Sequence, residues 1–323
     1  MPSSVLTFAG TLGVALCLTP LLRLLALRGR RPDERDSGRV PTTGGLAIFA
    51  AVSLVYLVLP PSLPAGFWLG ALGVVLTGLI DDFRPLSPIW KLVLQVVSVT
   101  LAVAFGVRLQ ALGIPLLDAL LTGCWLVWMC NALNVLDMMD GLAAGVGAIA
   151  SAALAGLAHL AGAPNLVLLG AGLAGGLSGF LVYNAHPARI YMGDSGSLFT
   201  GFVLGAMAAG ISGHLPPVQG LVCPLMILGV PFFEAAFLCV VRPLRGVPVM
   251  QSSPDHVALR LVARGCSVRG AVWRLYASSL VLAALGLLGA RGPAFGCWLI
   301  LGCVSILALG SGFCLARIDV ERA

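Results

Sequence analysis

Charged residues are scarce in this sequence. Only 10% of its 323 residues are charged, and Lys91 is the sole lysine. A soluble domain carries roughly 25% charged residues, so the composition excludes an ordinary soluble globular protein. Aromatic residues are also few, at 7%, whereas 59% of the residues are hydrophobic and 41 are Gly. Because small residues let membrane helices approach closely, this balance indicates an all-α polytopic membrane protein.

Several catalytic signatures are missing as well. The sequence contains no Walker A loop, no HExxH zinc site and no GxSxG nucleophile elbow, which argues against P-loop nucleotide hydrolysis, zinc proteolysis and ordinary serine hydrolysis. Its nine cysteines form no CxxC pair and lie almost entirely in apolar runs, where Cys acts as a small hydrophobic residue.

Apolar runs near the length that crosses a bilayer recur along the chain. We expect about eleven membrane spans, at 4–27, 44–60, 66–80, 89–106, 115–131, 142–161, 165–183, 197–212, 218–241, 271–290 and 294–316. Short turns alternate with longer polar loops between these spans. Among the basic residues, only Arg108 and Arg291 fall on the short-turn side.

This bias predicts that the long loops are cytoplasmic, with the N-terminus outside and the C-terminus inside. It also accounts for the net charge of +6 without a nucleic-acid partner. We expect a single transmembrane domain over 1–323, with cytoplasmic catalytic loops at about 28–43, 81–88, 132–141, 184–196 and 242–270.

Three charged residues flank the loop in GLIDDFRPLSPIWKLVLQ (78–95). Asp81 and Asp82 end one apolar span, and Lys91 begins the next. Charges at the membrane boundary are costly unless they are solvated, paired or functional. They are either helix-end charges that face water, or a carboxylate pair for a divalent cation or proton, with Lys91 directed at phosphate.

A regular polar pattern interrupts an apolar run in NALNVLDMMDGL (131–142). Asn131, Asn134, Asp137 and Asp140 recur every third residue, and the residues between them are apolar. Because residues three apart are neighbours on a helix surface, the spacing predicts one polar stripe along a helix, facing a polar cavity near the cytoplasmic surface.

A third polar segment, YNAHPARIYMGDSGSLFTGF (183–202), leaves one span and enters another. Asn184 lies at its start, and Asp194 lies just before the next apolar helix. Asp194 is either a helix-capping residue or part of a phosphate site at a helix N-terminus, and the two roles are compatible.

The basic loop at 242–265 offers His256 and Arg260. These residues either reflect the positive-inside bias or bind a pyrophosphate. Glu234, in the preceding span, either bridges toward the polar cluster or pairs with a basic residue.

These blocks, in this order, resemble the polyprenyl-phosphate N-acetylhexosamine-1-phosphate transferases of the MraY, WecA and TagO type. The similarity covers PTTGGLA (41–47), DDFRPLSPIWKLVLQ, NALNVLDMMDGL, NAHPARIYMGDSGS and PFFEAAFLCVVR. Met138 stands where the family usually has Gly. Only His256 remains of a His-x-His-His cluster, with Ala258 and Leu259 at the other positions.

The resemblance implies an enzyme that transfers a sugar-1-phosphate from a UDP-sugar to polyprenyl (undecaprenyl) phosphate and releases UMP. It implies Mg²⁺, or Mn²⁺ as an alternative, with Asp194 as the principal metal ligand and with Asp81 and Asp82 binding or deprotonating the acceptor phosphate. The remaining substrate-binding candidates are Asn131, Asn134, Asp137 and Asp140 around the nucleotide, Asn184 beside the phosphate, and Lys91, His256 and Arg260 facing phosphate oxygens. Direct attack by the lipid phosphate and a covalent Asp–phosphosugar intermediate both remain open, and the resemblance favours direct attack.

The spacing of DDFRPLSPIWKLVLQ is similar to the WecA/TagO branch. UDP-N-acetylglucosamine is therefore the first expected donor, ahead of UDP-N-acetylmuramoyl-pentapeptide and other UDP-N-acetylhexosamines. The resemblance implies a bacterial cytoplasmic (inner) membrane, an active site on the cytoplasmic face, a role in initiating cell-envelope glycan synthesis, and a homodimer.

A proton-coupled transporter is the competing class. Transporter sites tend to lie near the membrane midplane, within repeated halves. Here the acids gather at one expected membrane face and the sequence shows no repeat. A non-catalytic scaffold would not need these acids.

Overall fold

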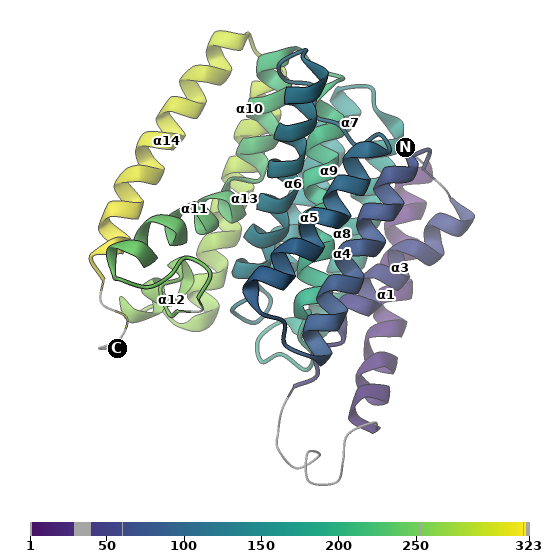
Figure 1. The fold of residues 1–323 in the computed structure, drawn as a ribbon, viewed down its shortest axis with the longest axis vertical. Coiled ribbons are helices and arrows are strands. Elements are labelled where there is room, and N and C mark those ends of the chain that lie inside the picture. The colour runs from purple at the N-terminus through teal and green to yellow at the C-terminus, as the bar shows by residue number, and fades with distance from the viewer. Residues whose placement is uncertain (1, 29–39, 60, 252, 319, 321–323) are drawn as a thin grey trace.

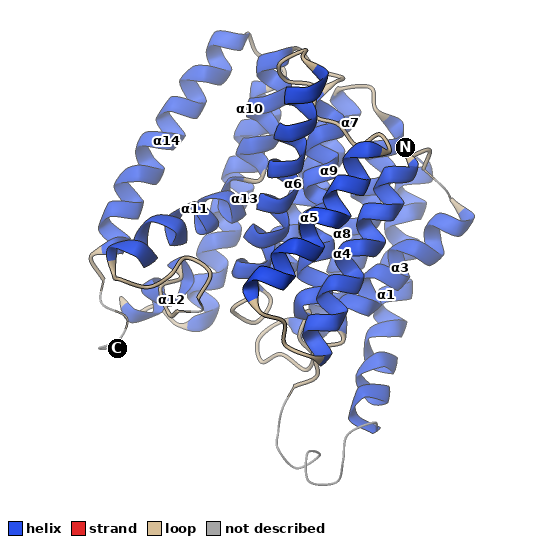
Figure 2. Cartoon of the chain, viewed as in Figure 1, coloured by secondary structure: helices blue, strands red, loops and turns tan. Residues whose placement is uncertain are grey.

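A computed structural model describes residues 2–28, 40–59, 61–251, 253–318 and 320, so most of the expected loop 28–43 lies outside the described residues. Within these ranges every regular element is a helix (Figure 2), which confirms the expected all-α class. The thirteen helices of the described ranges are α1 (Pro2–Arg28), α3 (Gly44–Val58), α4 (Ala65–Phe83), α5 (Pro88–Ala104), α6 (Pro115–Leu136), α7 (Leu142–Leu160), α8 (Pro164–Asn184), α9 (Gly193–Ser212), α10 (Pro217–Ile227), α11 (Gly229–Leu244), α12 (Val257–Ala263), α13 (Val268–Gly289) and α14 (Ala294–Ala316).

Several helix starts follow ordinary N-terminal chemistry. α5, α6, α8 and α10 each carry a proline at their first turn, where the missing N–H removes no intrahelical hydrogen bond. Ser87 and Ser267 cap α5 and α13, because their side-chain oxygens accept N–H groups of the first turn.

Helix α9 is the centre of the bundle. In an apolar stretch of 18 residues along α9, 94% of the residues are buried, whereas in the corresponding stretch of α14 only 6% are buried. α9 packs against α3, α4, α6, α7, α8 and α10, and α14 stands at the edge (Figure 1). The ends of several neighbouring helices therefore converge on the first turn of α9, where Asp194 lies.

Most of the expected spans form helices that can cross a membrane. Eight helices have sufficient length and hydropathy: α1, α4, α6, α7, α8, α9, α13 and α14. The expected spans 44–60 and 89–106 form the shorter apolar helices α3 and α5. The described chain has up to nine such spans if the bent α10–α11 pair counts as one, and the expected number of about eleven requires α3 and α5 to cross as well.

Two expected boundaries are wrong. The span 218–241 is not one straight helix, because α10 and α11 meet at an angle of 76° around Leu228. The expected loop 132–141 begins later, because α6 continues to Leu136. In Figure 1 the α4–α5 loop, α12 and the C-terminus lie toward one end of the bundle, and α1 begins toward the other.

The close approach of α4 to α9 depends on Gly78. A Cβ at this position would lie 2.3 Å from the backbone nitrogen of Ser195 and 2.4 Å from the carbonyl carbon of Asp194. We expect Gly78→Ala to force the helices apart and to lower the free energy of unfolding by about 1–3 kcal/mol, measured by thermal unfolding in detergent.

Gly13→Ala in α1 is the matched control. A Cβ at Gly13 meets nothing within 4 Å, and Ala is a better helix former than Gly. This variant should be as stable as the parent protein. Equal stability of the two variants would contradict the tight α4–α9 contact.

Candidate active site

Four helix ends bring the acidic and basic residues of the sequence blocks together. Asp81 and Asp82 lie in the last turn of α4, and Lys91 lies in the first turn of α5. Asn134 lies in the last turn of α6, and Asp194 lies in the first turn of α9. The packing of α4 and α6 against α9 joins three separate sequence blocks into one site.

The ammonium group of Lys91 lies at the centre of this site. Its Nζ is 3.0 Å from Asp81 Oδ2, 3.3 Å from Asn134 Oδ1, and paired with Asp194 Oδ2. The three charged side chains are only 15–27% exposed, so their attraction is screened less than that of a surface pair. The lone lysine therefore compensates two carboxylates at once.

Asp82 holds the N-terminus of α9 from the neighbouring helix. Its Oδ1 accepts the N–H of Asp194 at 2.8 Å, and its Oδ2 accepts the N–H of Ser195 at 3.1 Å. The first N–H groups of a helix have no intrahelical acceptor, so Asp82 fills the capping role considered for Asp194. Its expected contact with the acceptor phosphate stays a prediction.

The turn into α9 requires a glycine. Gly193 has a φ of +71°, and a Cβ there would lie 2.7 Å from Asp82 Oδ1. The PTTGGLA block supports the same turn, because the N–H groups of Gly44 and Gly45 donate to the carbonyls of Tyr191 and Met192 at 3.0 and 2.7 Å. The chain before Asp194 is thus held by backbone hydrogen bonds, and its own N–H is held by the Asp82 carboxylate.

The first two residues of the expected polar stripe, Asn131 and Asn134, lie on α6 as predicted. Asn134 donates from Nδ2 to Asp194 Oδ1 at 2.8 Å and to Ser197 Oγ at 3.0 Å. Asn131 donates to Gln95 Oε1 at 2.7 Å. Asn134 therefore orients Asp194 directly, and Asn131 lies one turn farther into the bundle.

The second half of the stripe is not helical. The helix ends at Leu136, so the prediction of one continuous helical stripe is wrong, and Asp137 and Asp140 lie in the following turn. Asp140 Oδ2 accepts the N–H of Ala188 at 3.0 Å and lies 2.8 Å from His186 Nδ1. These contacts connect the turn after α6 to the segment before α9.

Asn184 fixes the same two segments. Its side chain is only 2% exposed. Its Oδ1 accepts the N–H of Gly141 at 3.1 Å, and its Nδ2 donates to the carbonyl of Ile190 at 2.9 Å. The amide is thus satisfied by the protein and joins the two loops beside the site, and its expected place beside the phosphate stays a prediction.

Asp137 lies close to the other carboxylates. It is half-buried, and no hydrogen bond reaches its carboxylate from the part of the chain that the structure describes. Burial, together with the negative charges of Asp194, Asp82 and Asp140, raises its pKa to about 7. An ordinary Asp in an unfolded chain has a pKa of about 3.9.

We therefore expect a pH-dependent contribution of Asp137 to stability. Between about pH 4 and pH 7 the folded protein retains a proton that the unfolded chain releases, so stability falls as the pH rises through this window. Asp137→Asn should reduce this fall. The measurement is the unfolding temperature at pH 5 and pH 8 in detergent with EDTA. An equal fall in unfolding temperature for parent and variant would contradict the raised pKa.

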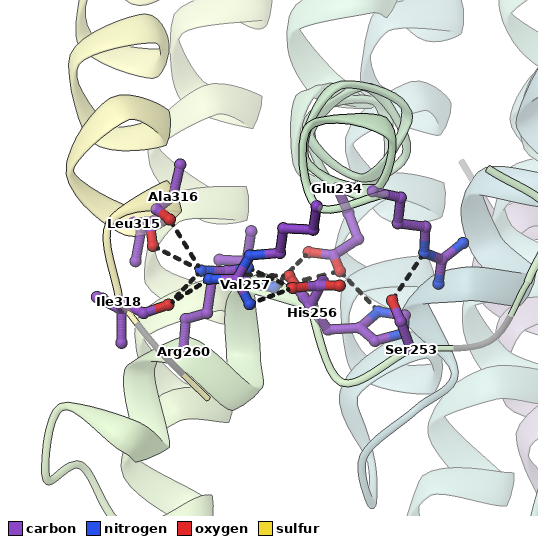
Figure 3. Close-up of polar contacts among 11 residues, drawn as sticks. Glu234, Ser253, His256, Val257, Arg260, Leu315, Ala316 and Ile318 are labelled. Carbon is purple, nitrogen blue, oxygen red and sulfur yellow. Dashed lines mark hydrogen bonds and ion pairs between the residues drawn. The ribbon is translucent and has the colours of Figure 1, made fainter. Parts of the chain in front are cut away.

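His256 and Arg260 lie in a second network (Figure 3). The side chain of Arg260 is fully buried, at 0% exposed. It lies 2.6 Å from Asp255 Oδ1 and donates to the carbonyls of Leu315 and Ile318 at 2.9 and 2.6 Å. The expected contact of Arg260 with a substrate phosphate is therefore wrong for this structure. The N–H groups of Arg260 already donate to protein acceptors, and its side chain is closed to solvent.

Arg260 should therefore matter for stability. Arg260→Lys keeps the charge but cannot reach all of these acceptors, so we expect a loss of about 2–4 kcal/mol in the free energy of unfolding. Arg264→Lys is the control, because Arg264 is exposed at the end of the same helix. Thermal unfolding in detergent compares the two, and similar curves would show that Arg260 does not anchor α14.

The acidic cluster suits a divalent cation that shares its ligands with substrate. Among the described residues, no three His, Cys, Asp or Glu side chains gather closely enough to hold a metal ion by themselves. Mg²⁺ usually binds through one or two carboxylates and completes its shell with water and phosphate. Asp194 and Asp81, which face the same ammonium group, fit that donor set.

Sequence reasoning missed Gln95 and His186. Gln95 lies four residues after Lys91 on α5, and such residues share a helix face, so its place beside Asn131 could have been inferred. His186 pairs with Asp140, a contact between loops for which the sequence offers no periodic signal.

Comparison with known proteins gives consistent matches. Residues 64–212 match the model of glycosyl transferase family 4. A probable undecaprenyl-phosphate N-acetylglucosaminyl 1-phosphate transferase of Bacillus subtilis is 30% identical, with 84% of this chain and 81% of the relative covered. Phospho-N-acetylmuramoyl-pentapeptide-transferases are 32% identical in a Synechococcus species, with 87% of each chain covered, and 33% identical in Moorella thermoacetica, with 76% and 83% covered.

Proposed function

Because the chain belongs to glycosyl transferase family 4, in the group of the MraY, WecA and TagO type, we propose that it transfers N-acetylglucosamine-1-phosphate from a UDP-sugar to polyprenyl phosphate. The products are UMP and a lipid-diphosphate-linked sugar. The observation that carries this proposal is the cluster of Asp81, Lys91 and Asp194 at the N-terminus of α9. Cationic groups and helix N-termini attract phosphate, and the carboxylates suit a shared metal ion.

An apolar cavity beside the cluster supports a lipid acceptor. It has a volume of about 690 Å³ and lies between α5 and α6, lined by side chains that include Val96, Val103 and Val127. Asn131 also lines it, one helical turn before Asn134. A hydrocarbon chain lying in this cavity would bring its phosphate toward Lys91 from the membrane side.

The chemistry requires close placement of two phosphates. An oxygen of the lipid phosphate attacks the sugar-bearing phosphorus, and the bond to the UMP phosphate breaks as its electron pair leaves with UMP. Phosphoryl transfer relies mainly on position and electrostatic stabilisation. Lys91 attracts the acceptor phosphate, and Asn134 and Asp82 hold Asp194 in place.

A bound Mg²⁺, or Mn²⁺ in its place, supplies charge neutralisation to the diphosphate. Asp194 would hold it, with Asp81 as the neighbouring carboxylate. Asp137 and Asp140 lie in the turn after α6, and we assign them to contacts with the nucleotide. The long loops on the side of the chain where the site lies carry most of the basic residues, chiefly in 28–43 and 242–270, and this bias supports an active site at the cytoplasmic face of a bacterial inner membrane.

The donor assignment has one strong competitor. The Bacillus subtilis relative is named for an N-acetylglucosaminyl donor, and the spacing of DDFRPLSPIWKLVLQ supports the same branch. Relatives named phospho-N-acetylmuramoyl-pentapeptide-transferase also cover most of the chain, so UDP-N-acetylmuramoyl-pentapeptide is the second donor to test.

One assay tests the function. Purified protein, undecaprenyl phosphate and Mg²⁺ are mixed with each of several UDP-sugars, and UMP release is measured. We expect the fastest release with UDP-N-acetylglucosamine, and no release with any donor would refute the transferase.

The matched variant is Asp194→Asn, which keeps the shape of the side chain. We expect it to lower Mg²⁺-dependent release at least about 100-fold, as is common when one electrostatic group at a reacting centre is removed. Its elution on size exclusion and its unfolding temperature should show a folded protein. Near-normal turnover would refute the assignment of Asp194 as a metal ligand.

A further inference from the structure

Glu234 is a buried acid outside the acidic cluster. It lies on α11, is only 2% exposed, and points toward the start of α12 (Figure 3). Its Oε1 lies 2.9 Å from His256 Nδ1, and both carboxylate oxygens lie 3.3 Å from the N–H of Val257. A buried carboxylate needs such partners, so Glu234 and His256 form one unit.

This contact determines which ring nitrogen of His256 is free. An ionised carboxylate can only accept hydrogen bonds, so Nδ1 carries a proton. The hydrogen bond at one ring nitrogen settles the role of the other. Nε2 is the nitrogen left to meet a ligand, and it donates to an anion when the ring is doubly protonated.

The segment that carries His256 is anchored on both sides. Arg242 of α11, only 5% exposed, donates to Ser253 Oγ at 3.0 Å and to the carbonyl of Val249 at 2.8 Å. On the other side Arg260 binds the end of α14. A side chain held in this way loses little further freedom on binding.

The place of this segment indicates which substrate it meets. It connects α11 to α13 outside the membrane-spanning helices, beside the basic residues Arg242 and Arg245. A nucleotide sugar is water-soluble and anionic, so it arrives on this aqueous side. The apolar cavity assigned to the lipid lies between α5 and α6. A second apolar cavity, of about 600 Å³, is lined by Glu234 and Val257 but not by His256.

We propose that Glu234 is a positioning residue that presents Nε2 of His256 to the diphosphate of the nucleotide sugar. The proposal rests on the proposed transferase function. It assigns the PFFEAAF block a part in donor recognition, through the histidine rather than by direct contact.

Steady-state kinetics at fixed pH test the proposal. Glu234→Gln keeps the side-chain shape but lacks the negative charge that pairs with a doubly protonated His256 ring, and its amide can also donate to Nδ1 and so admits the other tautomer. We expect the KM for the UDP-sugar to rise about tenfold, a loss of about 1.4 kcal/mol, while kcat changes less than about threefold and the KM for the lipid stays the same. An equal rise in both KM values would overturn the proposal.

A double-mutant cycle separates positioning from mere stability. His256→Ala alone should raise the donor KM, and Glu234→Gln added to it should raise the KM no further, because Glu234 acts through His256. Additive effects of the two changes would contradict the proposal. Thermal unfolding of each variant monitors the fold, and Arg264→Gln is the control for a nearby change of charge.

A spectroscopic measurement distinguishes this proposal from the proposed function. In ¹⁵N-histidine-labelled protein, His256 is assigned by comparison with His256→Ala. We expect its Nδ1 to be protonated in the parent protein and a tautomer mixture in Glu234→Gln. An unprotonated Nδ1 in the parent would refute the positioning role, whether or not any UDP-sugar is a substrate.

Discussion

The positive charge of Lys91 lies between two carboxylates that would repel each other without it. Asp81 comes from α4, Asp194 from α9 and Lys91 from α5, so one ammonium group connects three helices. Removing one member of a shielded charge network leaves the others uncompensated. In the proposed function, a divalent cation bound by these two carboxylates would release Lys91 to pair with phosphate.

The position of α9 makes this charge arrangement rigid. Gly78 lets α4 touch the first turn of α9, and Asp82 then accepts two of the N–H groups exposed there. Asn134 reaches the Asp194 carboxylate from α6. Contacts from helices hold a functional group with less freedom than contacts from loops. The Asp194 carboxylate is thus held by backbone and side-chain contacts before any substrate binds.

The proposed function gives the two substrates separate routes to this rigid centre. The apolar cavity between α5 and α6 suits a hydrocarbon chain arriving from the bilayer. The segment from α11 to α13, anchored by Arg242, Glu234 and Arg260, suits a soluble nucleotide arriving from water. Separate routes that end in fixed positions would replace a random encounter of two anions, and such positioning can lower a barrier by about 7–11 kcal/mol.

The sequence by itself determined the helical class, because lipid requires every backbone polar group to be satisfied within a helix. Polar residues inside its apolar runs also predicted Asp81, Lys91, Asn134 and Asp194 as site candidates, and these four lie together, whereas their roles stay predictions. It could not determine which charges pair. Local spacing predicted a helical stripe through Asp140, but α6 ends at Leu136. Arg260 was expected at a phosphate, whereas it binds carbonyls of Leu315 and Ile318. The tertiary structure decided these partners, because contacts between residues far apart in the chain depend on how complete helices pack.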